Sequence, residues 1–130
     1  MPEADETIVI YTTFANEQDA RKLGQELVGE RLAACVNIFP AMTSIYRWEG
    51  DVQEGSEVAM IVKSRSGLKD ALLAAIASRH PYTVPALLAF SPAQVATPYW
   101  DWLQRETTSQ GKADLQHSQS DALEKFKPKI

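Results

Sequence analysis

Apolar and β-branched positions concentrate between residues 32 and 64, in two runs that a polar turn at residues 49–51 separates. The second run contains the apolar segment 58–62 near its end. The first run contains Val36, Ile38, Phe39, Thr43, Ile45, Tyr46 and Trp48. Because such residues favour strands, the pattern predicts one long β-hairpin.

The predicted hairpin is long for a chain of this size. Its arms run to about a dozen residues or more, whereas an ordinary strand has about five or six. Pro40 lacks a backbone N–H, so it predicts a bulge or break that bends the first arm. Arms of this length overshoot a small domain, since each residue adds about 3.3 Å. We therefore expect the tip to pack on another subunit.

The segment before the hairpin predicts a strand and a helix. Residues 7–13 are dense in β-branched side chains and apolar on both faces, as in a central strand. Asn16 then offers an N-cap, and apolar residues recur at helical spacing until Gly29 or Glu30.

The segment after the hairpin predicts two further helices and a strand. Ser66 can cap a helix that must stop at Arg79 or His80, because Pro81 follows. Residues 86–90, which Pro85 precedes, are predicted to form a last apolar strand. Thr97 with Pro98 predicts the N-cap and first position of a short helix through residue 103.

This order of elements predicts an α+β fold, the ferredoxin-like βαββαβ sandwich with an extended hairpin and a short C-terminal helix. In that plan both helices cover one face of the sheet, so a monomer needs a polar opposite face. Residues 8–11, 58–62 and 87–90 are apolar on both faces instead. We therefore expect the open face to be covered by a partner subunit.

Length and composition divide the chain into three parts. The 130 residues are 45% hydrophobic, enough for a single core without a disulfide or metal. We expect an N-terminal arm at residues 1–6, one domain at residues 7–106, and a polar, flexible tail at residues 107–130.

Charge and cysteine content limit the partners and the compartment. The net charge is −4 and the basic residues are dispersed, which argues against nucleic acid as a partner. No apolar run approaches the roughly 18 residues of a membrane span, and the acidic start is unlike a secretory signal. The single cysteine suits a reducing compartment, so we expect a cytoplasmic protein.

Candidate chemistry is sparse. The sequence has no phosphate-binding loop and no GxSxG, CxxC or HExxH motif, so we expect no enzyme activity. Cys35 is an ordinary core residue or a soft copper ligand. His80 packs at or caps a helix C-terminus, or serves as a metal ligand. Tyr46 and Trp48 share one strand face and are candidate anchors of a subunit interface.

Three motifs stand out: ERLAACVN at residues 30–37, SIYRWEG at residues 44–50, and HPY at residues 80–82 with Val84-Pro85 following. In these motifs the sequence resembles the CutA divalent-cation-tolerance family. The resemblance covers about residues 7–106. Thr83 and Ala86 stand where the family often has acids, and Arg79 and Thr12 stand where some members have a further His or Cys.

The resemblance implies a ferredoxin-like homotrimer that is not an enzyme and is linked to tolerance of copper and other divalent cations. It implies no obligatory cofactor, with copper or another divalent cation bound weakly at His80 and, as the lesser candidate, Cys35. The family is also similar in architecture to PII-type signalling proteins. The alternative function is therefore a signalling or scaffold trimer that binds a small effector or partner protein in an inter-subunit cleft, lined by Trp48, Lys63 and Tyr82.

Overall fold

The computed structural model describes residues 4–108. From residue 109 onward, the tail that was predicted to be flexible lies outside the described residues. The described elements are β1 (Thr7–Phe14), α1 (Glu17–Gly29), β2 (Cys35–Trp48), β3 (Asp51–Arg65), a short 3₁₀ helix η1 (Ser66–Leu68), α2 (Lys69–Arg79), β4 (Leu88–Phe90) and α3 (Thr97–Glu106).

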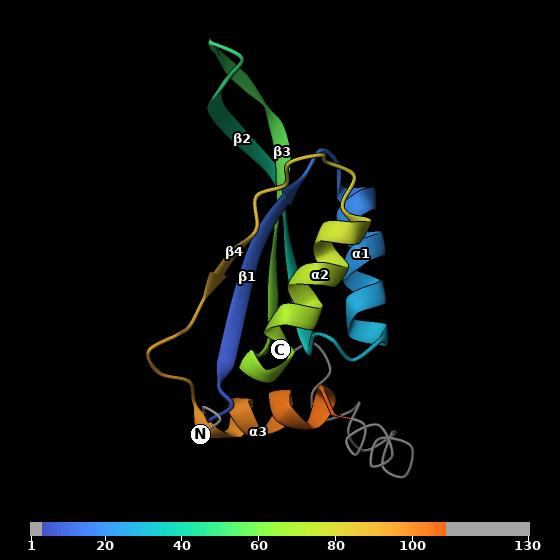
Figure 1. Ribbon diagram of the computed structural model, residues 1–130, viewed down its shortest axis with the longest axis vertical. Helices are drawn as coiled ribbons and strands as arrows, with labels where there is room; N and C mark the ends of the chain where they lie inside the picture. Colours follow the sequence, from blue (N-terminus) through green and yellow to red (C-terminus); the bar gives the residue numbers. More distant parts are fainter. Residues whose placement is uncertain (1–3, 109–130) are drawn as a thin grey trace.

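The four strands form one antiparallel sheet in the order β2-β3-β1-β4. Helices α1 and α2 lie side by side on one face, and α3 lies at the end of the sheet that is distant from the hairpin turn (Figure 1). This arrangement confirms the predicted α+β, ferredoxin-like fold.

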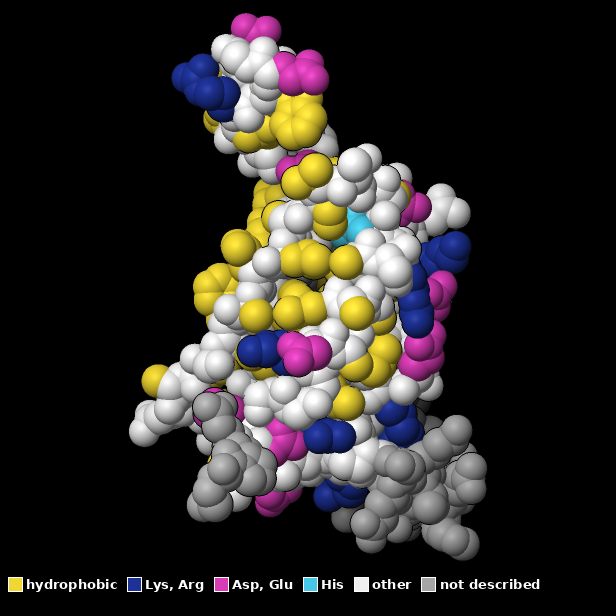
Figure 2. Space-filling view, in the orientation of Figure 1, with side chains coloured by type: hydrophobic (Ala, Val, Ile, Leu, Met, Phe, Trp, Pro, Cys, Tyr) yellow, Lys and Arg dark blue, Asp and Glu magenta, His cyan; other side chains and the backbone are white. Residues whose placement is uncertain are grey.

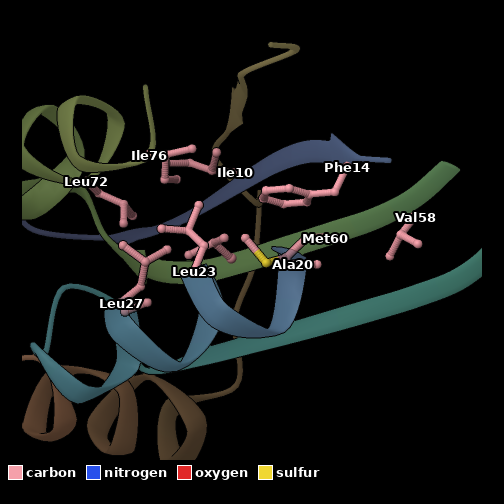
Figure 3. Packing of buried hydrophobic residues seen from close by; sticks show 11 residues of the cluster. Ile10, Phe14, Ala20, Leu23, Leu27, Val58, Met60, Leu72 and Ile76 are labelled. Carbon is pink, nitrogen blue, oxygen red and sulfur yellow. The ribbon is translucent and has the colours of Figure 1, made fainter. Parts of the chain in front are cut away.

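The core lies between the sheet and the two helices. Alternate residues of a strand point to opposite faces, so Ile10 and Phe14 of β1 face the helices with Met60 and Val62 of β3. Figure 3 shows Ile10, Phe14 and Met60 meeting Ala20, Leu23, Leu27, Leu72 and Ile76 from α1 and α2. The amphipathic pattern of the helices therefore buries their apolar stripes against one sheet face.

The hairpin β2–β3 projects well beyond the body of the subunit (Figure 1). Its strands have 14 and 15 residues, which confirms the predicted length. The pairing shifts register between Phe39 and Met42, and Ala41 has φ 61°, so a bulge follows Pro40 as predicted.

A two-residue turn closes the hairpin. Glu49 and Gly50 both have positive φ, 49° and 88°, while Trp48 pairs with Asp51. Two consecutive left-handed residues match the twist of the flanking strands. Asp51 therefore begins β3, and its predicted place within the turn is wrong.

Of the three predicted helix N-caps, one is confirmed and two are wrong. Asn16 caps α1, because its side-chain oxygen accepts the backbone N–H of Asp19 at 2.8 Å. Ser66 does not cap α2: it lies in η1, and its hydroxyl bonds to the N-terminal arm. The N-cap of α3 is Ala96 rather than Thr97, which is already the first helical residue.

The last strand is shorter than predicted. Only residues 88–90 pair with β1, whereas residues 86 and 87 lie in irregular chain after Pro85. Leu88 and Phe90 stand opposite Tyr11 and Val9 on the face that α1 and α2 leave open, and they are 50% and 53% exposed. Figure 2 shows exposed hydrophobic side chains over this edge of the subunit and on the hairpin.

Candidate functional site: an aromatic cavity at the base of the hairpin

His80 follows the end of α2 and is buried, with 8% of its surface exposed. Its Nδ1 accepts the backbone N–H of Tyr82 at 3.0 Å, so the ring proton resides on Nε2. Nε2 lies 2.8 Å from the carbonyl oxygen of Thr13 and 3.1 Å from the hydroxyl of Thr12. The ring also stacks on Phe14 with centroids 4.4 Å apart.

This environment keeps the imidazole of His80 neutral. Burial lowers its pKa, and the hydrogen bond to Thr13 with the charges of Asp19 and Glu57 offsets only part of that effect. The packing role of His80 thus agrees with the structure, but a charged imidazolium at the helix C-terminus does not. A metal ion at His80 has to displace one of the two ring hydrogen bonds, and this assignment stays a prediction.

Cys35 lies at the other end of the sheet. It pairs with Lys63 of β3, which pairs with Val9 of β1, whereas His80 contacts Thr13 four residues further along β1. Four residues of strand span about 13 Å. One subunit therefore does not bring the two predicted metal ligands together.

Cys35 is only partly buried and is not a core residue as predicted, because it pairs with Lys63 on the sheet face opposite the helices. Burial raises its pKa, and the nearby charge of Lys63 compensates only in part. Sγ lies 3.9 Å from the side-chain oxygen of Asn37. Within residues 4–108 no group of three or more His, Cys, Asp and Glu side chains gathers into a metal-binding cluster.

A cavity of about 460 Å³ opens where the hairpin leaves the body. Its lining includes Thr13, Tyr46, Trp48, Glu57, Tyr82 and Val84. Tyr46 and Trp48 are two residues apart in β2 and so share a face of the ribbon. They are 49% and 54% exposed, which leaves their rings open to a ligand or a neighbouring chain.

Glu57 is the charged group of this cavity. The hydroxyl of Tyr82 donates to its carboxylate at 2.7 Å. Burial by itself raises the pKa of Glu57, but hydrogen bonds from Ser44, Tyr82 and Thr13 outweigh burial, so the pKa lies below its ordinary value. The same contact, together with burial, raises the pKa of Tyr82. Glu57 is therefore a carboxylate at neutral pH, and Tyr82 is a neutral phenol.

The predicted cleft residues divide between two places. Trp48 and Tyr82 line the cavity together, but Lys63 lies six residues beyond Glu57 on β3, about 20 Å away along the strand. Its ammonium lies 5.9 Å from the centre of the Tyr99 ring in α3. Within a single subunit, Lys63 thus stands apart from the other two.

The sequence pattern does not single out Glu57. It is one of several acidic residues on the hairpin, and such spaced acids indicate a solvent-exposed rim of the ribbon. Its one distinguishing signal is its place directly before the apolar segment 58–62, where the ribbon joins the body.

The fold and the cavity define a small ferredoxin-like α+β protein that carries a projecting hairpin. Residues 8–106 match the family model of the CutA1 divalent ion tolerance protein. The chain belongs to this family, which confirms the resemblance of its three motifs.

Two curated relatives illustrate the range of the family. The divalent-cation tolerance protein CutA of Thermus thermophilus is 43% identical over 99 residues, which cover 76% of this chain and 96% of that protein. The mouse protein CutA is 41% identical over 99 residues, again 76% of this chain but only 56% of that protein. The chain thus spans only 55–60% of the length of most of the first relatives.

Solved structures of the family have the same fold. The CutA1 crystal structure from Ehrlichia chaffeensis superposes with a TM-score of 0.78 at 29% identity and covers 82% of this chain and 99% of that one. CutA1 from Oryza sativa superposes with a TM-score of 0.75 at 38% identity and covers 78% of this chain and 94% of that one. Among residues 4–108 no helix has the length and apolar character that crossing a membrane requires.

Proposed function

We propose that this chain forms a homotrimer that acts in the tolerance of divalent metal ions, without enzyme activity and without an obligatory cofactor. Membership of the CutA1 divalent ion tolerance family is the observation that carries the role in metal tolerance. The lone Cys35 favours the cytoplasm as the compartment.

The assembly is supported by apolar surface that a lone subunit leaves in water. Phe39, Leu88 and Phe90 of the sheet are half exposed. On the hairpin, Ile45 and Val52 are 67% and 65% exposed, and they lie on the face opposite Tyr46 and Trp48. Neighbouring subunits that cover both faces of the ribbon and the open sheet face would remove this surface from water.

Copper binding is proposed to be weak, with His80 as the first candidate ligand and Cys35 as the second. The supporting chemistry is that imidazole and thiolate suit copper. Affinity is low because His80 must give up a hydrogen bond and because one subunit keeps the two groups apart.

Copper titration of the full chain by calorimetry and electron paramagnetic resonance tests this assignment. Nitrogen hyperfine structure that is present in the wild type and lost in His80→Gln supports ligation by His80. Identical spectra in both proteins remove His80 from the site. Cys35→Ser serves as the matched variant for the thiol, with light scattering to verify that each variant keeps the trimer mass.

A second candidate function is a signalling or scaffold trimer that binds a small effector. The specific observation in its favour is the cavity, which is lined by two of the three predicted cleft residues, Trp48 and Tyr82, but not by Lys63. A thermal-shift screen of metabolites against metal ions separates the two functions, because only a ligand that prefers the folded state raises the midpoint. A shift by metals and by no metabolite counts against the second function.

A further inference from the structure

We propose that residues 113–115 of the chain, Ala-Asp-Leu, dock in a second cavity of the same subunit, at the end of the sheet distant from the hairpin turn. The carboxylate of Asp114 pairs with the guanidinium of Arg31, and the side chain of Leu115 packs on the apolar part of the lining. This inference is independent of metal binding and of the cavity at the base of the hairpin. It changes the predicted flexibility of the tail at these residues only.

The second cavity has a volume of about 470 Å³ and lies where α1 and α3 end. Its lining includes Leu32 and Leu68, which are partly exposed, and Thr107 and Thr108, which follow α3. Clefts of roughly 300–1,000 Å³ are typical of binding sites. Of the described residues that line it, none belongs to the projecting part of the hairpin or to the apolar residues that the proposed trimer covers. Those subunit contacts therefore leave the cavity open.

The backbone at Arg31 indicates a role for its side chain. The N–H groups of Arg31 and Leu32 donate to the carbonyl oxygens of Val28 and Leu27 at 3.1 Å and 3.0 Å, which is the Schellman motif at the end of α1. The left-handed position of that motif is usually Gly, but here Arg31 has φ 61°. A residue with a Cβ adopts this conformation only at a cost, so contacts of the Arg31 side chain are expected to offset it.

The guanidinium of Arg31 has few acceptors among the described residues. Its side chain is only 18% exposed, and Nη1 donates to the carbonyl oxygen of Glu106 at 2.8 Å. The carboxylate of Glu106 stands 3.6 Å from the same nitrogen, which is too far for a hydrogen bond. A guanidinium carries five N–H donors, and a largely buried charge requires a close partner. A further carboxylate fits this position.

The other charged groups of the lining already have partners. The carboxylate of Glu30 accepts two hydrogen bonds from Arg79, at 2.8 Å and 2.9 Å. Arg65 contacts the carboxylate of Asp5 at 2.9 Å. Within residues 4–108, Arg31 is thus the charged lining residue without a carboxylate at hydrogen-bond distance. The cavity therefore suits an acidic side chain that has an apolar neighbour.

The chain supplies such an occupant close to the cavity. Residues 109–130 continue from Thr108, which itself borders the cavity. Asp114 is the first acidic residue of this segment, and Leu115 is its first large apolar residue. The six residues from Thr108 to Asp114 span up to ~20 Å, which is enough to reach across the cavity.

Disulfide trapping in the full-length protein tests the proposal. The lone native thiol is first removed by Cys35→Ser. Leu68→Cys is then combined with Leu115→Cys or, as the matched control, with Leu123→Cys, and oxidised glutathione drives the reaction. These tail positions lie 7 and 15 residues after Thr108, so the entropy of loop closure alone favours the nearer one by about threefold. Docking should raise the ratio of the two rates to ~10-fold or more.

Two further pairs of variants test the two contacts separately. Asp114→Asn removes the charge that faces Arg31 and should slow trapping at residue 115 by ~5-fold, whereas Asp121→Asn should leave the rate unchanged. In the otherwise unaltered chain, Leu115→Ser should lower the thermal unfolding midpoint by ~2–4 °C, and Leu123→Ser should not.

Each outcome supports or overturns one part of the proposal. A rate ratio of about threefold or less overturns the docking. A disulfide between two chains, seen as a dimer under denaturing conditions, overturns the assignment to the same subunit. Equal rates in Asp114→Asn and Asp121→Asn overturn the pairing with Arg31. Equal midpoints of the two serine variants overturn the packing of Leu115, and this measurement stands even if the cysteine variants fail to fold.

Discussion

The Nε2 atom of His80 lies 2.8 Å from the carbonyl oxygen of Thr13, which ties the end of α2 to the end of β1. The same ring accepts the N–H of Tyr82, so it also orients the chain that borders the cavity. One neutral imidazole thereby joins the core, through its stack on Phe14, to the candidate binding site.

The burial of His80 predicts a pH dependence of stability. Its folded pKa is lowered, whereas an unfolded histidine titrates near pH ~6.5. Below that pH the unfolded chain binds a proton that the folded chain does not, so the free energy of unfolding decreases as the pH falls towards the folded pKa. Thermal unfolding between pH 7.5 and pH 5 measures this slope. His80→Gln should lower stability at pH 7.5 and flatten the slope; a slope equal to that of the wild type would contradict the prediction.

Asp5 predicts an effect of the N-terminal arm on stability. Its carboxylate accepts the N–H of Gly67 at 2.8 Å and contacts Arg65 at 2.9 Å, which caps the start of η1. Asp5→Ala should lower the free energy of unfolding by about 1 kcal/mol, as loss of a helix cap does. The neighbouring exposed Glu6→Ala is the control, and denaturant unfolding at neutral pH compares the two.

The same carboxylate predicts a second pH window. Burial raises the pKa of Asp5, but hydrogen bonds from Gly67, Arg65 and Ser66 and the charge of Arg65 bring it below its ordinary value. The stabilisation is therefore complete above pH ~4 and lost as the pH falls through the folded pKa. The difference in stability between wild type and Asp5→Ala should narrow below pH 4, and a constant difference would argue against the ion pair.

The sequence predicted the order of the elements because each has a strong local signal. Pro40 marked the bulge, and Asn16 marked the start of α1. The signals failed where a distant residue acts: Asp5 holds the backbone that Ser66 was expected to cap, from about sixty positions away. Glu57 acquires its role only when the loop after α2 brings Tyr82 to it. Such long-range contacts leave no periodic pattern.

The contact between α1 and β2 predicts different tolerance at two glycines. A Cβ at Gly24 would lie 3.1 Å from Val36 Cγ1, whereas a Cβ at Gly55 would have no neighbour within 4 Å. Gly24→Val adds further methyl groups at the crowded site and should cost about 1–3 kcal/mol of stability. Gly55→Val should cause no loss, since a β-branched residue suits a strand. Chemical denaturation of both variants measures the contrast, and equal effects would show that α1 does not pack this closely.

The hairpin offers the sharpest test of the proposed trimer. Val52 is 65% exposed on the projecting ribbon, where a lone subunit should tolerate a charge at little cost, within about 0.5 kcal/mol. If a neighbouring subunit covers this face, Val52→Asp places a carboxylate in an apolar contact and should weaken assembly by several kcal/mol. Light scattering during dilution measures the effect, with Gln25→Asp on the exposed side of α1 as the control. A trimer that Val52→Asp leaves intact at nanomolar concentration would show that the ribbon is not buried on its neighbour, while a monomeric wild type would remove the trimer itself.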